Sequence, residues 1–173
     1  HMTIFLSTWV LPLMFIMHDF EEMIVMPIWK RRHHRLISGM DKPFFGPVGN
    51  GQAFTAGVLE EMCILLAVSL VSGLTGNLTL YLVFCVAYTA HFIMHFRMCA
   101  QIRGYVPGVV SAALQTPVML LLIVVLWRLD DSSLLVYTLY QLLALAFVVA
   151  NLKVMHGLMP RIESAFLVYA ENR

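Results

Sequence analysis

The chain has few charged residues and few cysteines. Only 12% of its 173 residues are Asp, Glu, Lys or Arg, about half of the share that is usual in soluble domains. Its three cysteines form no CxxC pair, which argues against a zinc ribbon and against a disulfide framework. No Ser-rich or Pro-rich linker divides the chain, and a net charge of +1 gives no reason to expect a nucleic-acid partner.

Apolar residues predominate in the chain and indicate the class of protein. They account for 60% of the chain, against about 45 to 50% in globular proteins. Five apolar stretches reach the roughly 20 residues that a helix needs to cross the hydrocarbon core of a bilayer. They cover residues 4–29, 53–73, 78–102, 107–127 and 133–156. The sequence therefore predicts an all-α, polytopic membrane protein: one bundle of five transmembrane helices over residues 3–173, preceded by a cloning remnant, His1 and Met2.

The basic residues predict the orientation of this bundle. Lys and Arg near the ends of spans are retained on the cytoplasmic side of a membrane. Ten of the eleven basic residues fall on one side of the predicted membrane, and Arg128 alone falls on the other. We therefore expect the N-terminus outside and the C-terminus inside, in an inner (cytoplasmic) membrane. The lipid bilayer is the expected partner, and the sequence leaves a homo-oligomer open.

Seven ionisable side chains stand out because they lie inside these apolar stretches, where such groups are costly and usually functional. They are His18, Glu21, Glu22, Glu60, Glu61, His91 and His95. The helical rise of about 1.5 Å per residue puts the residues of all three spans roughly 12 to 18 Å from the cytoplasmic ends. The sequence therefore predicts that they share one layer and form one site.

Their spacing and chemistry predict a metal site. His18 precedes Glu22 by four residues, and His91 precedes His95 by four, so each pair shares a helix face. Imidazole and carboxylate suit zinc, iron and manganese, and helix bundles build dinuclear sites from Glu and His on facing helices. Four carboxylates would be neutralised by two divalent ions. We therefore predict a dinuclear site with all seven residues as ligands, iron being favoured over zinc or manganese.

Neighbouring carboxylates leave the exact ligand set open. Adjacent residues of a helix point about 100° apart, so one Glu of each pair is expected to act as a general base or a supporting group. We assign this catalytic role to Glu21 and Glu60. Asp19 turns away from His18 by the same angle and is left outside the ligand set. His156, near the end of the last span, is expected to cap or snorkel.

A family resemblance rests on these same residues. The segment from His18 to Glu22, together with the later Glu pair, the His pair and the RGYVPG stretch at 103–108, resembles the HXXEE family of small membrane proteins. The resemblance implies an integral membrane protein with metal-dependent enzyme activity, and it supplies no reaction. Membrane proteases of the CAAX-processing type are similar in having a Glu pair and His on separate spans. They place an Arg after that pair, however, and Met62 to Leu65 contain none.

Three functions remain after this reasoning. The first is a dinuclear metalloenzyme acting on a lipid or another lipophilic substrate, with carboxylate-bridged di-iron oxidation favoured. In it, Arg97, Arg103 and Tyr105 would hold a polar headgroup. The second is a zinc-dependent membrane hydrolase, in which the metal lowers the pKa of bound water to about 7. The third is a metal-free carrier, in which the acids and histidines pair with one another or line a proton path.

Overall fold

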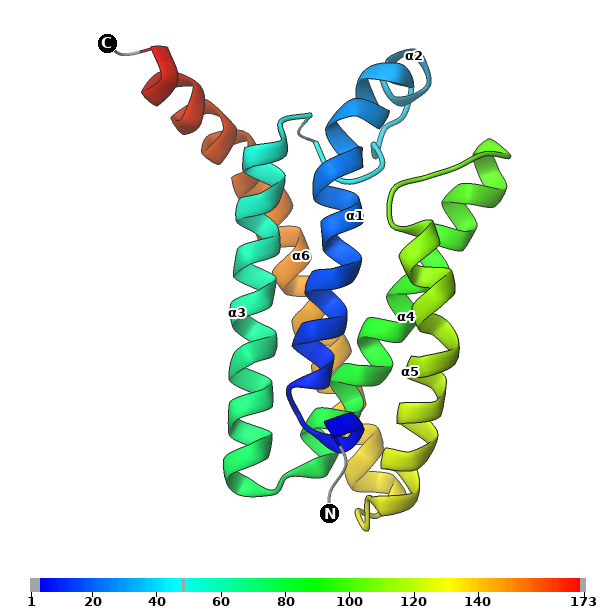
Figure 1. The fold of residues 1–173 in the computed structure, drawn as a ribbon. Helices are drawn as coiled ribbons and strands as arrows, with labels where there is room; N and C mark the ends of the chain where they lie inside the picture. The colour runs from blue at the N-terminus through cyan, green and yellow to red at the C-terminus, as the bar shows by residue number, and fades with distance from the viewer. Residues whose placement is uncertain (1–3, 48, 172–173) are drawn as a thin grey trace.

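The computed structural model describes residues 4–47 and 49–171, and this part of the chain is all-α. His1 and Met2, assigned above to cloning, lie outside the described residues. A short 3-10 helix, η1 (Ile4–Leu6), precedes six α-helices. These are α1 (Val10–Arg32), α2 (His34–Ile37), α3 (Gly51–Thr75), α4 (Leu78–Ile102), α5 (Val109–Leu129) and α6 (Leu134–Glu171). Figure 1 shows the five long helices running along one bundle, with α2 at the end where the C-terminus lies.

Four of the helices are long and apolar enough to cross a membrane: α3, α4, α5 and α6. The chain is therefore a multi-pass membrane protein by helix length and hydropathy. Helix α1 has the length, 23 residues, but it carries three carboxylates, Asp19, Glu21 and Glu22, and a basic last turn. It nevertheless packs within the bundle against α3 and α5 and is a candidate fifth span. The orientation in the membrane stays a prediction.

Local capping explains where the central helices begin and end. The side chains of Asn50 and Asn77 accept hydrogen bonds from the backbone N–H groups of Ala53 (2.9 Å) and Leu80 (3.0 Å), which caps α3 and α4. Gly76 ends α3 in the left-handed conformation, with a φ of +69°, which a glycine adopts without strain. The turn signals in the sequence therefore correspond to real helix boundaries here.

The last helix continues well past the predicted span. The apolar stretch ends at 156, yet α6 runs for 38 residues to Glu171 with Pro160 inside it. A proline removes one helical hydrogen bond and usually marks a helix end. Here Met159 and Ile162 pack on Ala53 at the beginning of α3, so tertiary packing supports the extra turns.

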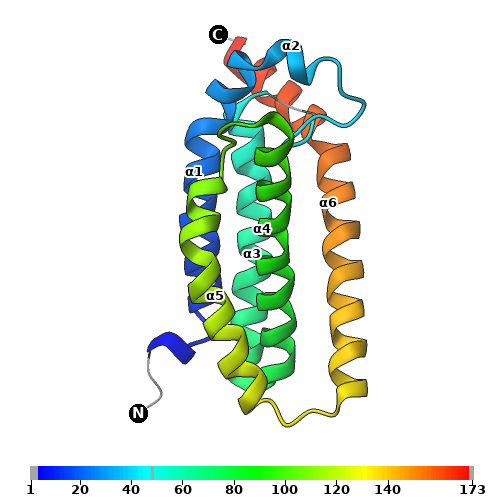
Figure 2. The ribbon, with the colours of Figure 1, turned by 90° about the vertical axis from the view of Figure 1, so that its right-hand side faces the viewer.

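Helix α4 lies at the centre of the bundle and α6 at its edge. Helix α4 packs against α3, α5 and α6, and Figure 2 shows α1 and α5 on one side of it and α6 on the other. Buried residues make up 56% of the most apolar stretch of α4, against 6% of that of α6. Polar side chains on the inner face of α4 are therefore held in a well-packed environment.

Tyr81 on α4 anchors the beginning of α1. Its hydroxyl accepts a hydrogen bond from the Leu11 N–H (3.1 Å) and donates one to the Ser7 carbonyl oxygen (3.2 Å). The Leu11 N–H lies in the first turn of α1, where no carbonyl of the helix itself is available. We expect Tyr81→Phe to lower the free energy of unfolding by about 1–3 kcal/mol, because a buried polar group loses its partner.

This prediction is tested by unfolding in detergent. Tyr137→Phe is the matched control, since within the described residues that hydroxyl bonds only to Gln141, one turn along the same helix. Equal stability of the two variants would contradict an anchoring role for Tyr81.

Candidate metal centre

Four side chains from two helices bring their ligand atoms together. His18 and Glu22 come from α1, and His91 and His95 come from α4. One ligand atom from each lies within 4.8 Å of the other three. His18, Glu22 and His95 are buried, whereas His91 is partly exposed. The i, i+4 spacing places both members of each pair on one helix face, and α1 and α4 turn these faces toward each other.

His95 lies at the middle of this group. Its Nε2 atom is 2.9 Å from Glu22 Oε1, 2.9 Å from His91 Nε2 and 3.2 Å from His18 Nε2. Glu22 Oε1 is in turn 3.1 Å from His18 Nε2. Three imidazole nitrogens and one carboxylate oxygen thus surround a common centre.

The hydrogen-bond partners of the Nδ1 atoms of His95 and His18 show which nitrogens of these two rings carry protons. His95 Nδ1 is 2.9 Å from the Pro107 carbonyl oxygen, which can only accept, so Nδ1 is the donor. His18 Nδ1 is 2.9 Å from Ser111 Oγ, and that hydroxyl gives its own proton to Glu21 at 2.5 Å. His18 Nδ1 is therefore also a donor. A neutral imidazole carries one N–H, so the Nε2 atoms of both rings present lone pairs to the centre.

Ion pairing without a metal explains this arrangement less well. Glu22 would be satisfied if His18 and His95 were both protonated, but two imidazolium nitrogens would then lie 3.2 Å apart. If one ring were protonated, its single inner proton could serve only one of the three short contacts that His95 Nε2 makes. A cation at the centre would be bound at once by the Nε2 lone pairs of His18 and His95 and by Glu22, with His91 Nε2 beside them.

The turn between α4 and α5 closes one side of the site. Gly108 has a φ of +84°, and a Cβ there would lie 2.5 Å from His95 Cε1 and 2.7 Å from Glu22 Oε1. The preceding residue, Pro107, supplies the carbonyl oxygen that holds His95. The sequence indicated a turn at RGYVPG, but it gave no sign that this backbone touches the ligand residues.

Helix α3 supplies none of the four converging residues, but its side chains line the cavity beside them. Glu60 Oε2 accepts a hydrogen bond from Asn151 Nδ2 on α6 at 3.1 Å. Glu61 lines a cavity of about 680 Å³, and Glu22 and His95 line the same cavity. Asp19, which the sequence left outside the ligand set, is buried and also lines it. Two further carboxylates therefore border the centre from this cavity.

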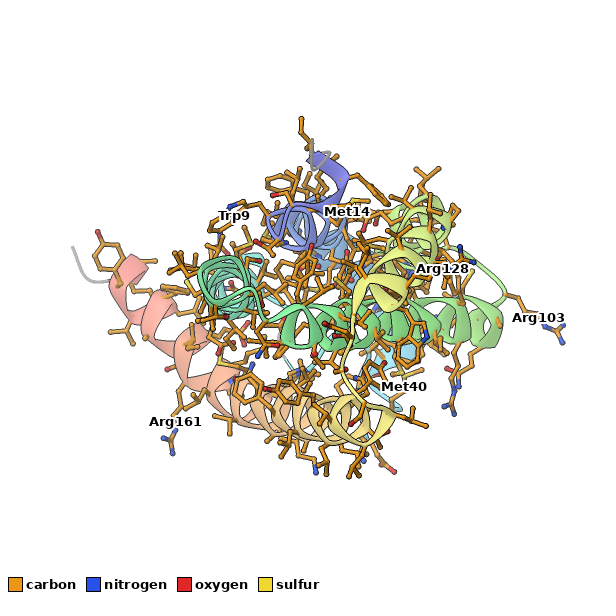
Figure 3. All side chains as sticks on the ribbon, turned by 90° about the horizontal axis from the view of Figure 1, so that it is seen from below. Trp9, Met14, Met40, Arg103, Arg128 and Arg161 are labelled. Atoms are coloured by element: carbon orange, nitrogen blue, oxygen red, sulfur yellow. The ribbon has the colours of Figure 1, made fainter. Side chains whose placement is uncertain are left out.

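The three residues expected to hold a headgroup lie in different places. Arg97 lines the cavity that reaches the ligand residues. Arg103 is exposed at the end of α4 and points away from the helices (Figure 3). The hydroxyl of Tyr105 donates a hydrogen bond to Glu21 at 2.7 Å, on the α5 side of the site.

A family model described as a protein of unknown function with HXXEE motif matches residues 9–125, more than half of the chain. The chain belongs to the HXXEE family. The matched range contains all four converging residues and the turn that closes the site, and it ends before α6. No curated protein and no solved structure matches the chain.

The residues that name the HXXEE motif have different environments. His18 and Glu22 belong to the converging group, whereas Glu21 points to α5. Glu21 Oε2 accepts hydrogen bonds from the Ser111 backbone N–H (2.7 Å) and from its hydroxyl (2.5 Å). Burial and the bond to Glu21 raise the pKa of the Tyr105 hydroxyl, which keeps it a donor. In this structure, Glu21 orients His18 through Ser111.

We expect Ser111→Ala to weaken metal binding by about 10- to 100-fold, the usual effect of removing a group that orients a ligand histidine. The substitution leaves His18 in place but removes the acceptor of its Nδ1–H. Competition with a chelator measures the affinity. Thr116→Ala is the control, because in the described part of the chain the Thr116 hydroxyl bonds only to the backbone of its own helix. Equal affinities in the two variants would show that Ser111 has no orienting role.

Proposed function

We propose that this HXXEE protein is a membrane metalloenzyme that holds one divalent transition-metal ion at the converging group. The ligands would be Nε2 of His18, His91 and His95 and Oε1 of Glu22. The observation that carries the proposal is that these four atoms lie within 4.8 Å of one another while the outer nitrogens of two rings hold the protons. Three imidazoles and one carboxylate suit zinc, and also ferrous iron.

The surroundings of the site support hydrolysis of a lipophilic substrate. Zinc held by these four residues would have to bind a water molecule as a fifth ligand, and it would lower the pKa of that water to about 7. We assign the general base to Glu61, because it and His91 line both of the cavities that meet at the site. Glu61 would take the proton of the attacking water and deliver it to the leaving group. Asp19, which lines the same cavity, would accept a hydrogen bond from the attacking water.

The distribution of carboxylates supports one ion over two. Four Glu residues favoured a di-iron centre in the sequence, yet Glu21 binds Ser111 and Glu60 binds Asn151. The converging group is therefore rich in nitrogen, which favours zinc over a carboxylate-bridged iron pair.

Dinuclear oxidation is the second candidate, and one observation favours it. Asp19 and Glu61 line the same cavity as Glu22, so three carboxylates border a volume that could take a second ion. Iron with bridging carboxylates would then act on a substrate in this cavity.

Metal analysis separates these candidates. Protein purified from cells grown with both iron and zinc should contain about one zinc per chain if it is a hydrolase of this kind. About two irons per chain, with an optical absorption band, would favour dinuclear oxidation. Protein without bound metal would overturn both and favour the proton path. The control is His34→Ala, an exposed histidine outside the bundle core, which should leave the metal content unchanged.

A further inference from the structure

Three cavities follow one another along α4 and pass the candidate metal centre. The first has a volume of about 680 Å³ and includes the ligand residues. The second, about 160 Å³, shares Glu61 and His91 with the first. The third, about 500 Å³, shares Phe84 and Phe147 with the second. The residues they share place the three cavities next to one another, from the loop before α3 to the groove between α3, α4 and α6, and we call this series the path.

The side chains that line the path change from charged at one end to apolar at the other. Lys42 and Arg97 line the first cavity, and both are exposed. Within residues 4–47 and 49–171, neither forms an ion pair with a carboxylate. The third cavity is lined by hydrocarbon and aromatic side chains, with the Tyr140 hydroxyl as the exception. The first cavity therefore combines two basic side chains with the carboxylates of Asp19, Glu22 and Glu61, and the third cavity is an apolar groove.

The dimensions of this path fit one lipid chain. On α4, Leu80 in the third cavity lies eleven residues from His91, or about 17 Å along the helix. One leaflet of the bilayer, half of a hydrocarbon core of about 30 Å, is about 15 Å thick. Arg97 lies six residues from His91 in the other direction, about 9 Å, which leaves room for a headgroup. The middle cavity is by far the smallest, which favours one chain over two.

We propose that the substrate is a single-chain, anionic amphiphile drawn from the bilayer, with a phosphate-type headgroup. Lys42 and Arg97 bind the headgroup, the groove between α3, α4 and α6 holds the chain, and the linkage between them lies at the metal centre. This inference rests on the proposed function. Hydrolysis at that linkage consumes one water: its hydroxyl goes to the acyl or phosphoryl centre, and its proton goes through Glu61 to the leaving oxygen.

Binding of stable alkyl probes tests the headgroup site. Hexadecyl phosphate should bind the purified protein at least about tenfold more tightly than hexadecyl phosphocholine or hexadecyl maltoside, since tenfold corresponds to about 1.4 kcal/mol. Arg97→Gln and Lys42→Gln should each lose most of this preference, and Arg97→Lys should keep it. Arg103→Gln, at the exposed end of α4, is the matched control and should bind as the wild type does. Inorganic phosphate alone should not compete.

A second arm tests the chain site. Ala87 lines the narrow middle cavity, and Ala90, three residues along α4, is exposed and is not part of the path. Ala87→Phe should remove the preference for a hexadecyl over an octyl chain, whereas Ala90→Phe should keep it. Equal behaviour of the two variants would overturn the chain assignment.

All measurements are made on metal-loaded and metal-stripped protein, with metal content determined separately. Headgroup preference in both forms supports the amphiphile proposal independently of the chemistry of the ion. Equal affinity for charged and neutral probes, an Arg97→Gln variant that binds like Arg103→Gln, or full competition by inorganic phosphate would overturn it. If the protein binds metal but shows no preference for the anionic headgroup, this inference is refuted and the proposed function is not. If it shows this headgroup preference but binds no metal, the proposed function is refuted and the amphiphile site is not.

Discussion

Replacing His95 by alanine is expected to weaken metal binding strongly. His95 Nε2 is the one atom with short contacts to each of the other three ligand atoms, at 2.9, 2.9 and 3.2 Å. Structural zinc sites with four ligands bind with about 10–16 kcal/mol, so one ligand contributes roughly a quarter of that. Its loss should weaken binding by at least about a hundredfold.

The experiment compares His95→Ala with His156→Ala by metal analysis and chelator competition. His156 lines the same cavity but is not one of the four converging residues. Size-exclusion chromatography and helix content show whether each variant is folded. A folded His95→Ala protein with wild-type metal content would remove His95 from the site and leave the proposed centre without its middle ligand.

A methyl group at position 108 is expected to have an effect of similar size. The Cβ of Gly108→Ala would overlap His95 Cε1 at 2.5 Å and Glu22 Oε1 at 2.7 Å. Neither ligand can withdraw freely, because His95 is also held by the Pro107 carbonyl oxygen and Glu22 is buried. We expect at least about a hundredfold loss of metal affinity, since displaced ligands no longer share one centre.

Gly76→Ala separates this steric effect from backbone strain. Gly76 also has a positive φ, +69°, but no atom lies within 4 Å of the Cβ that would be added. That control should lose about 1–2 kcal/mol of stability through the left-handed conformation alone and should keep its metal. Equal loss of metal in both variants would mean that strain, and not contact with the ligands, explains the result.

The apolar stretches predict much of this fold because the bilayer imposes a simple length requirement on each helix. Helices α3, α4, α5 and α6 each contain most of one predicted stretch, and the i, i+4 spacings predict the pairs on α1 and α4. Composition does not show how far tertiary packing extends a helix beyond its apolar stretch. The continuation of α6 to Glu171 depends on contacts of Met159 with Ala53, a residue more than a hundred positions earlier.

The choice within each Glu pair shows where sequence reasoning ends. Adjacent residues differ by about 100° in direction, and the rotation of a helix about its axis is set by packing with its neighbours. The sequence therefore could not decide that Glu22, and not Glu21, lies with His18, or that Glu61 lines the cavity while Glu60 reaches Asn151.

The supporting residues were missed for a different reason. Gly108, Pro107 and Ser111 are not ionisable, and they act through a missing Cβ, a carbonyl oxygen and a hydroxyl. The only signal in the sequence was the turn between two apolar stretches, which many loops share.

The carboxylates of α1 also bear on the order in which the bundle is assembled. Asp19, Glu21 and Glu22 make insertion of this helix alone into lipid costly. Partners of Glu21, Glu22 and His18 lie on α4 and α5, with His95 77 residues beyond His18 and Ser111 90 residues beyond Glu21. Helix α1 therefore leaves the ribosome well before the helices that supply these partners, and capture of an ion would be the step that secures it.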